Sequence, residues 1–350
     1  MESFLIMACF LAKATYYQDA FKLKIAPTPL GFLRQLKGLT IFDVIGKDTS
    51  RTRVITTLIH GNEPSGFIAL HHWLIEKKRP EINIRFILCN PEAAILPPEF
   101  SHRYLEATQD LNRFFTLNNI QSTQSNYAIR HRAKQIIAAV NEVNPEAIVD
   151  LHNTSGISPA FGVSISDSEQ ALDLISLFTN KVILTGLHVG AIMEQQFSAP
   201  IVTIECGGAR QIQSHQLAIA GLKKLTNKKN IFDHHAGLVD IHLHPFRIEL
   251  KKGTVLGFSD YPLIKADITL RIDTEQLNNQ ITVAGQHIGW YKKNNPLPLI
   301  VKDEEGNNKL SVIFQLHEGG IYTKQNLQIF MATQSLDIAT NDCLFYATLE

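Results

Sequence analysis

Residues 54–63 read VITTLIHGNE, and this stretch decides the fold. Its first part, Val54–Ile59, is rich in β-branched residues and predicts a buried strand. The apolar run that follows, Pro64–Lys77, predicts a helix that is buried on nearly all sides. Between them the turn carries an imidazole at His60 and a carboxylate at Glu63. A strand that passes through a polar turn into a helix is one unit of an α/β fold.

Strands and helices continue to alternate up to about residue 235. Four further apolar runs predict strands: Ile84–Cys89, Ala147–Leu151, Phe161–Ser166 and Ile201–Ile204. Two further windows have apolar residues at helical spacing: Tyr127–Val143 and Gln213–Leu225. We therefore expect an α/β domain in which helices flank a sheet.

After about residue 238 the pattern changes, because helical periodicity ends and turn signals separate short strand-like segments. These segments are Asp267–Ile272, Ile281–Val283, His287–Tyr291 and Leu310–Leu316. The sequence thus predicts two domains. An α/β domain occupies residues 1–237, and a β-rich domain, a small sandwich or barrel, occupies residues 238–350.

Composition limits the classes of function. With 350 residues, 45% hydrophobic and 19% charged, the chain can bury a large core and is not predominantly disordered. Its 33 basic and 33 acidic residues balance, which argues against a nucleic-acid partner bound through phosphates. The four cysteines form no CxxC pair and fit a reducing compartment. No apolar run reaches the ~20 residues of a membrane helix, so we expect a cytoplasmic protein without a membrane partner.

Two positions of the α/β domain carry candidate metal ligands. His60 and Glu63 lie three residues apart in a turn, a spacing that can direct both side chains at one ion. His152 follows the strand predicted at Ala147–Leu151, where open α/β sheets gather their sites, and can supply a third ligand. Two histidines and one carboxylate leave a position for water, as catalytic zinc sites do. A capped turn and a hydrogen-bonded histidine at a strand end are the alternative interpretations.

Two further positions carry candidate catalytic and binding groups. Arg103, with Asn112 and Arg113, could bind a substrate carboxylate and stabilise an oxyanion, since guanidinium is a fixed, always charged fork. A salt-bridged surface loop is the alternative. Glu205 ends the apolar run Ile201–Ile204, and a carboxylate beside activated water is a suitable general base. The alternative for Glu205 is a structural role at a strand end.

Four motifs occur in order along the α/β domain: HGNE at 60–63, DLNR at 110–113, DLHNT at 150–154 and IECGG at 204–208. Together with Arg103, this combination resembles the succinylglutamate desuccinylase/aspartoacylase family of zinc carboxypeptidase-like hydrolases. The motifs cover roughly residues 50–210, and the β-rich tail matches the family's C-terminal domain only loosely. The resemblance implies a zinc carboxypeptidase-like mixed sheet with flanking helices, followed by a β-rich barrel or sandwich.

The resemblance also implies a role for each candidate residue. His60, Glu63 and His152 would bind zinc, one ion per chain. Glu205 would be the general base, and Arg103 would polarise the scissile carbonyl and hold the oxyanion. The residues that would bind substrate are Asn112, Arg113 and, from the C-terminal domain, Tyr322.

The implied function is a zinc-dependent hydrolase that cleaves the amide bond of a small, carboxylate-bearing N-acyl amino acid, and an ester by the same steps. A zinc carboxypeptidase acting on peptides and a non-catalytic zinc-binding relative remain open alternatives. Thr57–Ile59 stand where the family usually has glycines before HGNE, and Cys206–Gly208 replace its more familiar ending after the glutamate. The sequence therefore fixes neither the acyl group nor the amine, and a homo-oligomer can be neither predicted nor excluded.

Overall fold

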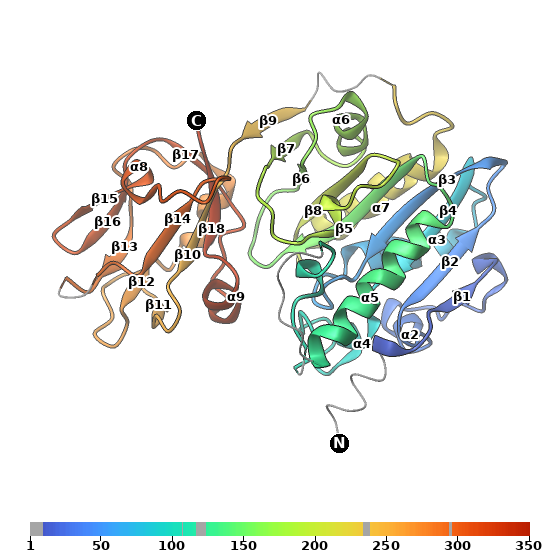
Figure 1. Cartoon of the computed structure of the whole chain (residues 1–350), viewed down its shortest axis with the longest axis horizontal. Helices are drawn as coiled ribbons and strands as arrows, with labels where there is room; N and C mark the ends of the chain where they lie inside the picture. The colour runs from blue at the N-terminus through green and yellow to red at the C-terminus, as the bar shows by residue number, and fades with distance from the viewer. Residues whose placement is uncertain (1–9, 107, 117–123, 234–238, 294–295) are drawn as a thin grey trace. The chain divides into compact units, whose positions relative to one another are not determined.

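The structure is a computed structural model, which describes residues 10–106, 108–116, 124–233, 239–293 and 296–350 (Figure 1). The chain forms two compact units. The first comprises residues 1–153, 160–182 and 188–240, and the second comprises residues 154–159, 183–187 and 241–350. The division of the sequence between residues 237 and 238 stays a proposal. The sequence pattern does not reveal that two short earlier segments belong to the second unit.

A nine-stranded mixed sheet organises the first part of the chain. Its strands are, in spatial order, β1 (Thr15–Tyr17), β2 (Thr40–Val44), β4 (Ile82–Leu88), β3 (Asp48–Thr57), β5 (Ala147–Thr154), β8 (Ile201–Gly208), β6 (Phe161–Ser164), β7 (Lys181–Leu184) and β9 (Asp240–Leu243). Strand β3 is parallel to both β4 and β5, whereas β2 is antiparallel to β4 and β6 to β8. The predicted mixed α/β fold is confirmed.

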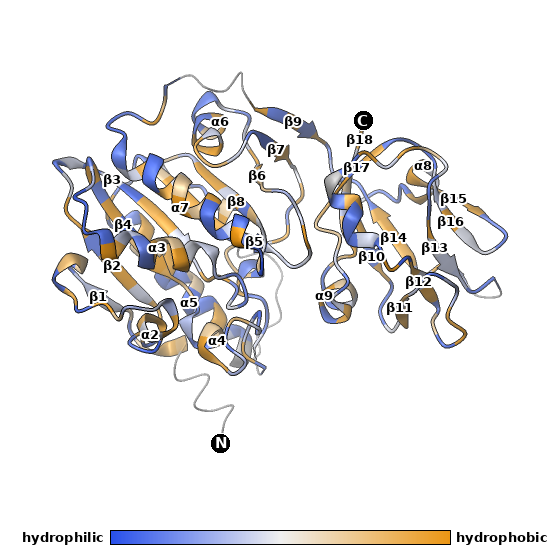
Figure 2. Ribbon diagram, turned by 180° about the vertical axis from the view of Figure 1, so that it is seen from behind, coloured by the Kyte–Doolittle hydropathy of each residue, from blue (hydrophilic) through white to orange (hydrophobic). Residues whose placement is uncertain are grey.

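Helices cover both faces of this sheet. They are α2 (Pro29–Leu33), α3 (Ser65–Glu76), α4 (Pro91–Ile95), α5 (Gln124–Asn141), α6 (Glu169–Ser176) and α7 (Ile212–Asn227), with short 3-10 turns η1 (Ala20–Lys22), η2 (Leu111–Arg113) and η3 (Ile192–Glu194). α5 lies in front of the sheet in Figure 1, while α3 and α7 lie on the opposite face, which Figure 2 shows. Trp73 of α3 donates a hydrogen bond to Thr226 of α7 (3.1 Å), which links these two helices. Among the described residues, none of the helices combines the length and apolar character that a bilayer span requires.

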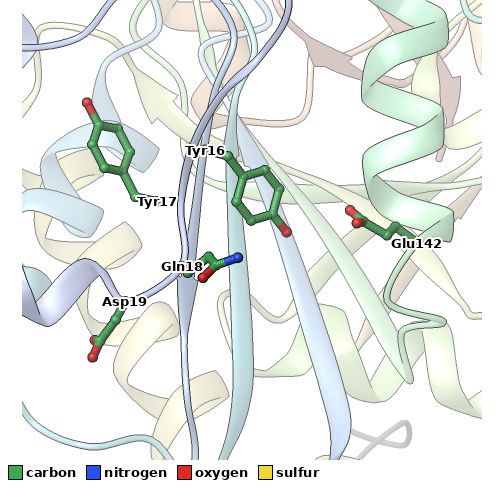
Figure 3. Close-up of a pocket in the computed structure, with 5 residues that line it drawn as sticks. All are labelled: Tyr16, Tyr17, Gln18, Asp19 and Glu142. Carbon is green, nitrogen blue, oxygen red and sulfur yellow. The ribbon is translucent and has the colours of Figure 1, made fainter.

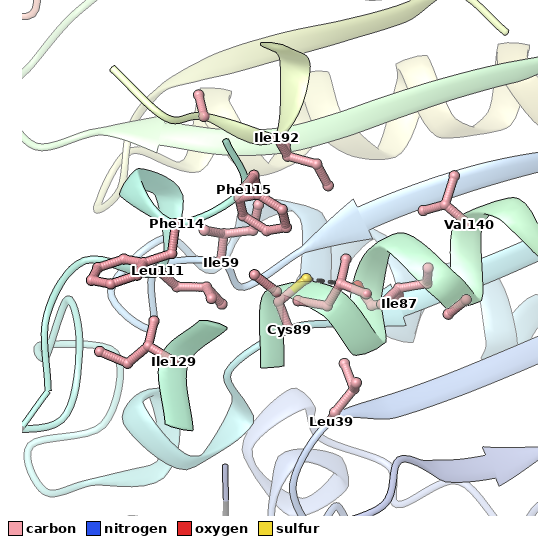
Figure 4. Packing of buried hydrophobic residues seen from close by; sticks show 14 of the residues in the cluster. Leu39, Ile59, Ile87, Cys89, Leu111, Phe114, Phe115, Ile129, Val140 and Ile192 are labelled. Carbon is pink, nitrogen blue, oxygen red and sulfur yellow. Dashed lines mark hydrogen bonds between the residues drawn. The ribbon is translucent and has the colours of Figure 1, made fainter. Parts of the chain in front are cut away.

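The core beneath α5 holds the loop that carries the DLNR motif. Ile129 and Val140 of α5 are fully buried in one cluster with Ile87 of β4 (Figure 4). Leu111 and Phe115, which flank the polar part of the motif, belong to the same cluster. Burying these side chains stabilises the loop by roughly 1.5–3 kcal/mol each and so fixes its polar residues against the sheet.

The second unit is β-rich, as predicted. Its four-stranded sheet consists of β14 (Leu299–Lys302), β10 (Phe246–Leu250), β18 (Phe345–Leu349) and β17 (Leu327–Phe330), in this order. Its five-stranded sheet consists of β11 (Leu256–Phe258), β12 (Ile268–Leu270), β13 (His287–Tyr291), β16 (Gly320–Thr323) and β15 (Phe314–His317). The remaining elements are α8 (Leu310–Ile313), α9 (Leu336–Asn341) and η5 (Thr274–Asn279). One apolar core contains residues of both sheets, among them Ile248, Val301 and Ile321.

Two strands predicted in this unit differ from the structure. The segment Ile281–Val283 forms no strand, since Thr282 makes only an isolated bridge with Leu327. The segment predicted as a strand from Leu310 begins as helix α8 and becomes strand β15 at Phe314. The backbone N–H of Leu310 donates to the side chain of Asn308 (3.0 Å), and such local bonds favour a turn over a strand.

Arg53 is a buried structural link of the first unit. Its side chain in β3 is 0% exposed and donates from Nε to Glu146 (2.5 Å). Its other nitrogens donate to backbone carbonyls at the end of α7 and just beyond it: Leu225, Lys228 and Lys229. One guanidinium therefore holds the end of helix α7 to the sheet.

We predict that Arg53→Met lowers the free energy of unfolding by about 3–5 kcal/mol, because it leaves several carbonyls at the end of α7 without their charged donor and removes one of the guanidinium groups that pair with Glu146. Urea denaturation followed by circular dichroism measures the change. Lys47→Met is the matched control, since Lys47 pairs with Glu81 at the surface and its loss should cost about 0–1 kcal/mol. Equal effects of the two substitutions would contradict the structural role of Arg53.

Candidate metal centre

The structure brings His60, Glu63 and His152 together. Each offers one ligand atom, these atoms lie within 4.8 Å of one another, and all three residues are buried. His152 belongs to β5, which pairs in parallel with β3, so the segment that follows β3 and the end of β5 meet at one edge of the sheet. The predicted proximity of the three side chains is therefore confirmed, and their role as metal ligands stays a prediction.

The ends of both strands, β3 and β5, differ from the prediction. β3 ends at Thr57 and not at Ile59, because Leu58 adopts φ 53°, a left-handed conformation that breaks a strand. β5 continues through His152 to Thr154, so this histidine lies within the strand. Gly61 lies so close to α4 that a Cβ atom there would be 2.5 Å from the backbone nitrogen of Ala94. A glycine is therefore required for the turn to approach this helix.

Each histidine lies between two carboxylates. His60 Nδ1 is 2.8 Å from Glu63 Oε1, and its Nε2 is 2.8 Å from Asp110 Oδ1. His152 Nδ1 is 2.7 Å from Glu63 Oε2, and its Nε2 is 2.6 Å from Asp150 Oδ2. A neutral imidazole has only one N–H, so two carboxylates are satisfied only by a ring that carries two protons or binds a cation.

This arrangement fits a metal ion. Two imidazole nitrogens and a carboxylate are a common zinc donor set, and metal-bound histidines usually give their second N–H to a carboxylate, as Asp110 and Asp150 allow here. Burial alone would lower the pKa of His152, but the Asp150 and Glu63 carboxylates outweigh it and raise that pKa well above its usual value. Burial opposes ionisation of Glu63 as well, yet the two imidazoles lower its pKa. The site thus stabilises positive charge at the Nδ1 positions.

Asp110 connects the group to Arg103. Arg103 donates from Nη2 to Asp110 Oδ2 (3.0 Å) and from Nη1 to Glu63 Oε1 (3.1 Å). Burial would raise the pKa of Asp110, but His60, Arg103 and Arg113 hold it well below its usual value. The predicted oxyanion residue therefore lies against the candidate metal ligands, positioned by a carboxylate that the sequence did not single out.

The predicted substrate-binding residues follow Asp110 in the turn η2. The side chain of Asp110 accepts from the backbone N–H of Asn112 (2.8 Å) and stabilises the turn. Asn112 is 9% exposed, and its side-chain Oδ1 accepts from the backbone N–H of Ile192 (3.0 Å). Arg113 is more exposed, and its Nη2 lies 3.8 Å from Asp110 Oδ2. Contact of Asn112 or Arg113 with a substrate stays a prediction.

Glu205 is a buried carboxylate with an unusual pKa. It lies within β8, which runs beyond the predicted strand end to Gly208, and it is 7% exposed. Among the described residues its Oε2 has no hydrogen-bond partner. Burial, reinforced by the Glu63 carboxylate and opposed by His152, raises the pKa of Glu205 to about 7. A carboxyl group with this pKa can both accept and release a proton near neutral pH.

The remaining candidate, Tyr322, lies in the second unit. It belongs to strand β16, where it pairs with Gln315 and its ring centroid lies 4.9 Å from that of His287. Its role in substrate binding stays a prediction.

A surface cavity of about 580 Å³ lies beside strand β1 (Figure 3). Its lining residues are Tyr16, Tyr17, Gln18, Asp19 and Glu142. None of these belongs to the candidate metal centre, so the cavity gives no support to the predicted site.

One protein family and several known proteins match part of this chain. The family model described as "Succinylglutamate desuccinylase/Aspartoacylase catalytic domain" matches residues 50–227. An aspartoacylase from Xenopus tropicalis is 34% identical over 105 residues, which are 27% of this chain and 32% of that protein. A probable aspartoacylase from Nostoc sp. is 35% identical over 104 residues, which are 27% of this chain and 33% of that protein. The chain thus matches about a third of the length of these relatives.

Solved structures share the fold over a longer range. The succinylglutamate desuccinylase of Vibrio parahaemolyticus superimposes with a TM-score of 0.54 and 17% identity, covering 88% of this chain and 86% of that one. Murine aminoacylase 3 gives a TM-score of 0.53 and 16% identity, covering 87% and 96%. The family model itself covers more than half of the chain and includes every candidate residue of the metal centre. The chain belongs to the succinylglutamate desuccinylase/aspartoacylase family.

Proposed function

We propose that the chain is a zinc-dependent amidohydrolase that releases the acyl group from a small N-acyl amino acid bearing a carboxylate. The observation that carries this proposal is the convergence of His60, Glu63 and His152 in a buried, carboxylate-rich site. The sequence relatives support a deacylase, since they are named aspartoacylases. Membership of the family supports the same chemistry.

His60, Glu63 and His152 would hold the zinc ion through two imidazole nitrogens and one carboxylate, leaving room for water and substrate. A zinc ion in this position would lower the pKa of a water molecule and polarise the scissile carbonyl. Asp110 and Asp150 would keep the two rings in place, because each carboxylate accepts from the Nε2 of its histidine.

The chain's own residues would move the proton and stabilise the developing charge. Glu205 would take a proton from the attacking water and then give it to the leaving nitrogen, a double role that suits its pKa of about 7. The Arg103 guanidinium would donate hydrogen bonds to the oxyanion, and removing such a donor typically costs ~10²–10³ in rate. Ester cleavage would use the same groups and depend less on the final proton transfer.

The substrate carboxylate would be bound beside this group. Arg113 offers a planar fork that pairs with both oxygens of a carboxylate, and Asn112 adds a neutral donor. Tyr322 stays our candidate for a contribution from the β-rich domain. We expect a cytoplasmic enzyme, with neither nucleic acid nor membrane as partner.

A substrate panel tests the proposed reaction. Zinc-loaded protein is incubated with N-acetyl-aspartate, N-succinyl-glutamate and a set of dipeptides, and the release of free amine is measured. We expect release from at least one N-acyl amino acid. Cleavage of the dipeptides alone would favour a carboxypeptidase, and the absence of any cleavage would favour a non-catalytic zinc-binding relative.

We predict about one zinc ion per chain when the protein is purified without chelators, because the three side chains form one site. Inductively coupled plasma mass spectrometry measures the content. His152→Ala should lose the metal, since only two donors remain. His244→Ala is the control, because this histidine is exposed, pairs with Glu304 and should not affect zinc content. Full zinc content in His152→Ala would remove that residue from the site.

We predict that Glu205→Gln keeps the zinc but hydrolyses the best substrate about 10²–10⁴-fold more slowly, because the amide cannot accept the proton. Steady-state kinetics and metal analysis of the same sample check both statements. Glu305→Gln, a change at the surface, should leave the rate unchanged. Turnover at the wild-type rate in Glu205→Gln would exclude this carboxylate as the base.

A further inference from the structure

Asn153, which directly follows His152, uses its whole side-chain amide in hydrogen bonds. It is 2% exposed. Its Oδ1 accepts from the backbone N–H of Ser65 (2.9 Å), while its Nδ2 donates to Ser65 Oγ (2.8 Å) and to the carbonyl of Gly207 (2.8 Å). Both N–H groups are therefore used. A flipped amide would direct its NH₂ at an N–H and its oxygen at a carbonyl, so the orientation is fixed.

These bonds join the three segments that carry the candidate site. Ser65 begins α3 two residues after Glu63, and Gly207 lies in β8 two residues after Glu205. The backbone N–H of Asn153 also donates to Glu63 Oε2 (3.3 Å). Gly207 has φ 99°, a conformation that favours glycine, so the backbone that carries the carbonyl bound by Asn153 is one that other residues rarely adopt. One amide thus links the ends of β5 and β8 to the turn before α3.

A second layer holds this amide in place. Ser65 Oγ lies 2.8 Å from His215 Nδ1, on helix α7. The hydroxyl oxygen accepts from Asn153 and can donate its single hydrogen to Nδ1, in which case His215 accepts as a neutral ring. Burial lowers the pKa of His215, which favours the same neutral form. Without this acceptor the serine hydroxyl would lose a bond that fixes its rotation, and it would hold the Asn153 amide less firmly.

We propose that Asn153, locked by Ser65 and His215, is a positioning residue that sets the spacing between Glu205 and the metal-ligand group. This inference rests on the proposed function. The candidate ligand group consists of His60, Glu63 and His152, and Asn153 meets it through the backbone N–H that donates to Glu63. The effect of Asn153, Ser65 and His215 would be exerted through the geometry of the residues they hold, and outer-shell partners of this kind typically contribute about 10–100-fold to metal affinity or activity.

Three variants test whether Ser65 and His215 hold Asn153 in place. Ser65→Ala removes the hydroxyl, His215→Phe removes the acceptor, and His215→Asn keeps an acceptor oxygen near the position of Nδ1. His215 is only half-buried on its helix, so the fold should tolerate both changes. His72→Phe is the matched control, because His72 is a partly exposed histidine on α3 that pairs with Glu76. Zinc affinity is measured by chelator competition, together with kcat, KM and the Tm of the metal-free protein.

We expect Ser65→Ala and His215→Phe to weaken zinc binding and lower kcat, each by about 10–100-fold, with KM and the metal-free Tm nearly unchanged. His215→Asn and His72→Phe should behave like the wild type. Wild-type affinity and kcat in Ser65→Ala and His215→Phe would overturn the inference, as would a lower Tm with unchanged zinc affinity.

The outcome also separates this inference from the proposed function. A wild-type protein that binds zinc but hydrolyses no substrate overturns the proposed reaction alone, since zinc affinity still reports on the lock. A wild-type protein that takes up no zinc overturns both, and this is seen before any variant is made.

Discussion

The carboxylate of Glu63 is the group on which the rest of the site depends. Its two oxygens lie 2.8 Å and 2.7 Å from the Nδ1 atoms of His60 and His152, deep in the protein. A buried carboxylate costs several kcal/mol unless positive charge and hydrogen bonds surround it. Both imidazoles and Arg103 meet that need, and Asp110 and Asp150 in turn hold the imidazoles. These charged groups therefore stabilise one another, which explains why residues far apart in the sequence meet here.

The fold holds these charged groups in a rigid arrangement. Parallel pairing of β3 with β5 places His152 next to the turn that carries Glu63, while Leu58 and Gly61 shape that turn. Apolar residues of the DLNR loop are buried under α5, so the polar residues between them face the site. Asn153 then links these strands and this turn to β8 through its hydrogen bond to Gly207. Rigid strands and buried anchors hold a site of this kind more precisely than loops alone could.

Motif order indicated seven candidate residues in the first unit, of which the structure brings His60, Glu63 and His152 together. Local pattern predicted five strands and three helices of this unit, because apolar periodicity is visible in the sequence, but it did not predict β1, β2, β7 or β9. It failed at strand ends. β5 and β8 continue through His152 and Glu205 because their buried polar groups lie in the sheet's interior, which no local pattern shows. In the second unit, the helix at the start of Leu310–Leu316 is favoured by local bonds such as that of the Leu310 N–H to Asn308, which the apolar pattern does not show. Contacts such as His60 with Asp110 join distant segments, so only the folded chain reveals them.

The second unit includes two short pieces of chain that precede its main segment by many residues. Asn278 and Glu275 bind Ile157, and Glu304 binds the backbone N–H of Gly186. These contacts belong to residues 154–159 and 183–187, which the chain contributes before it returns to the first unit. No single cut can separate the two units intact. In evolution, a gene fusion that added or exchanged residues 241–350 as a block would have needed a first unit whose loops 154–159 and 183–187 already fitted the new block.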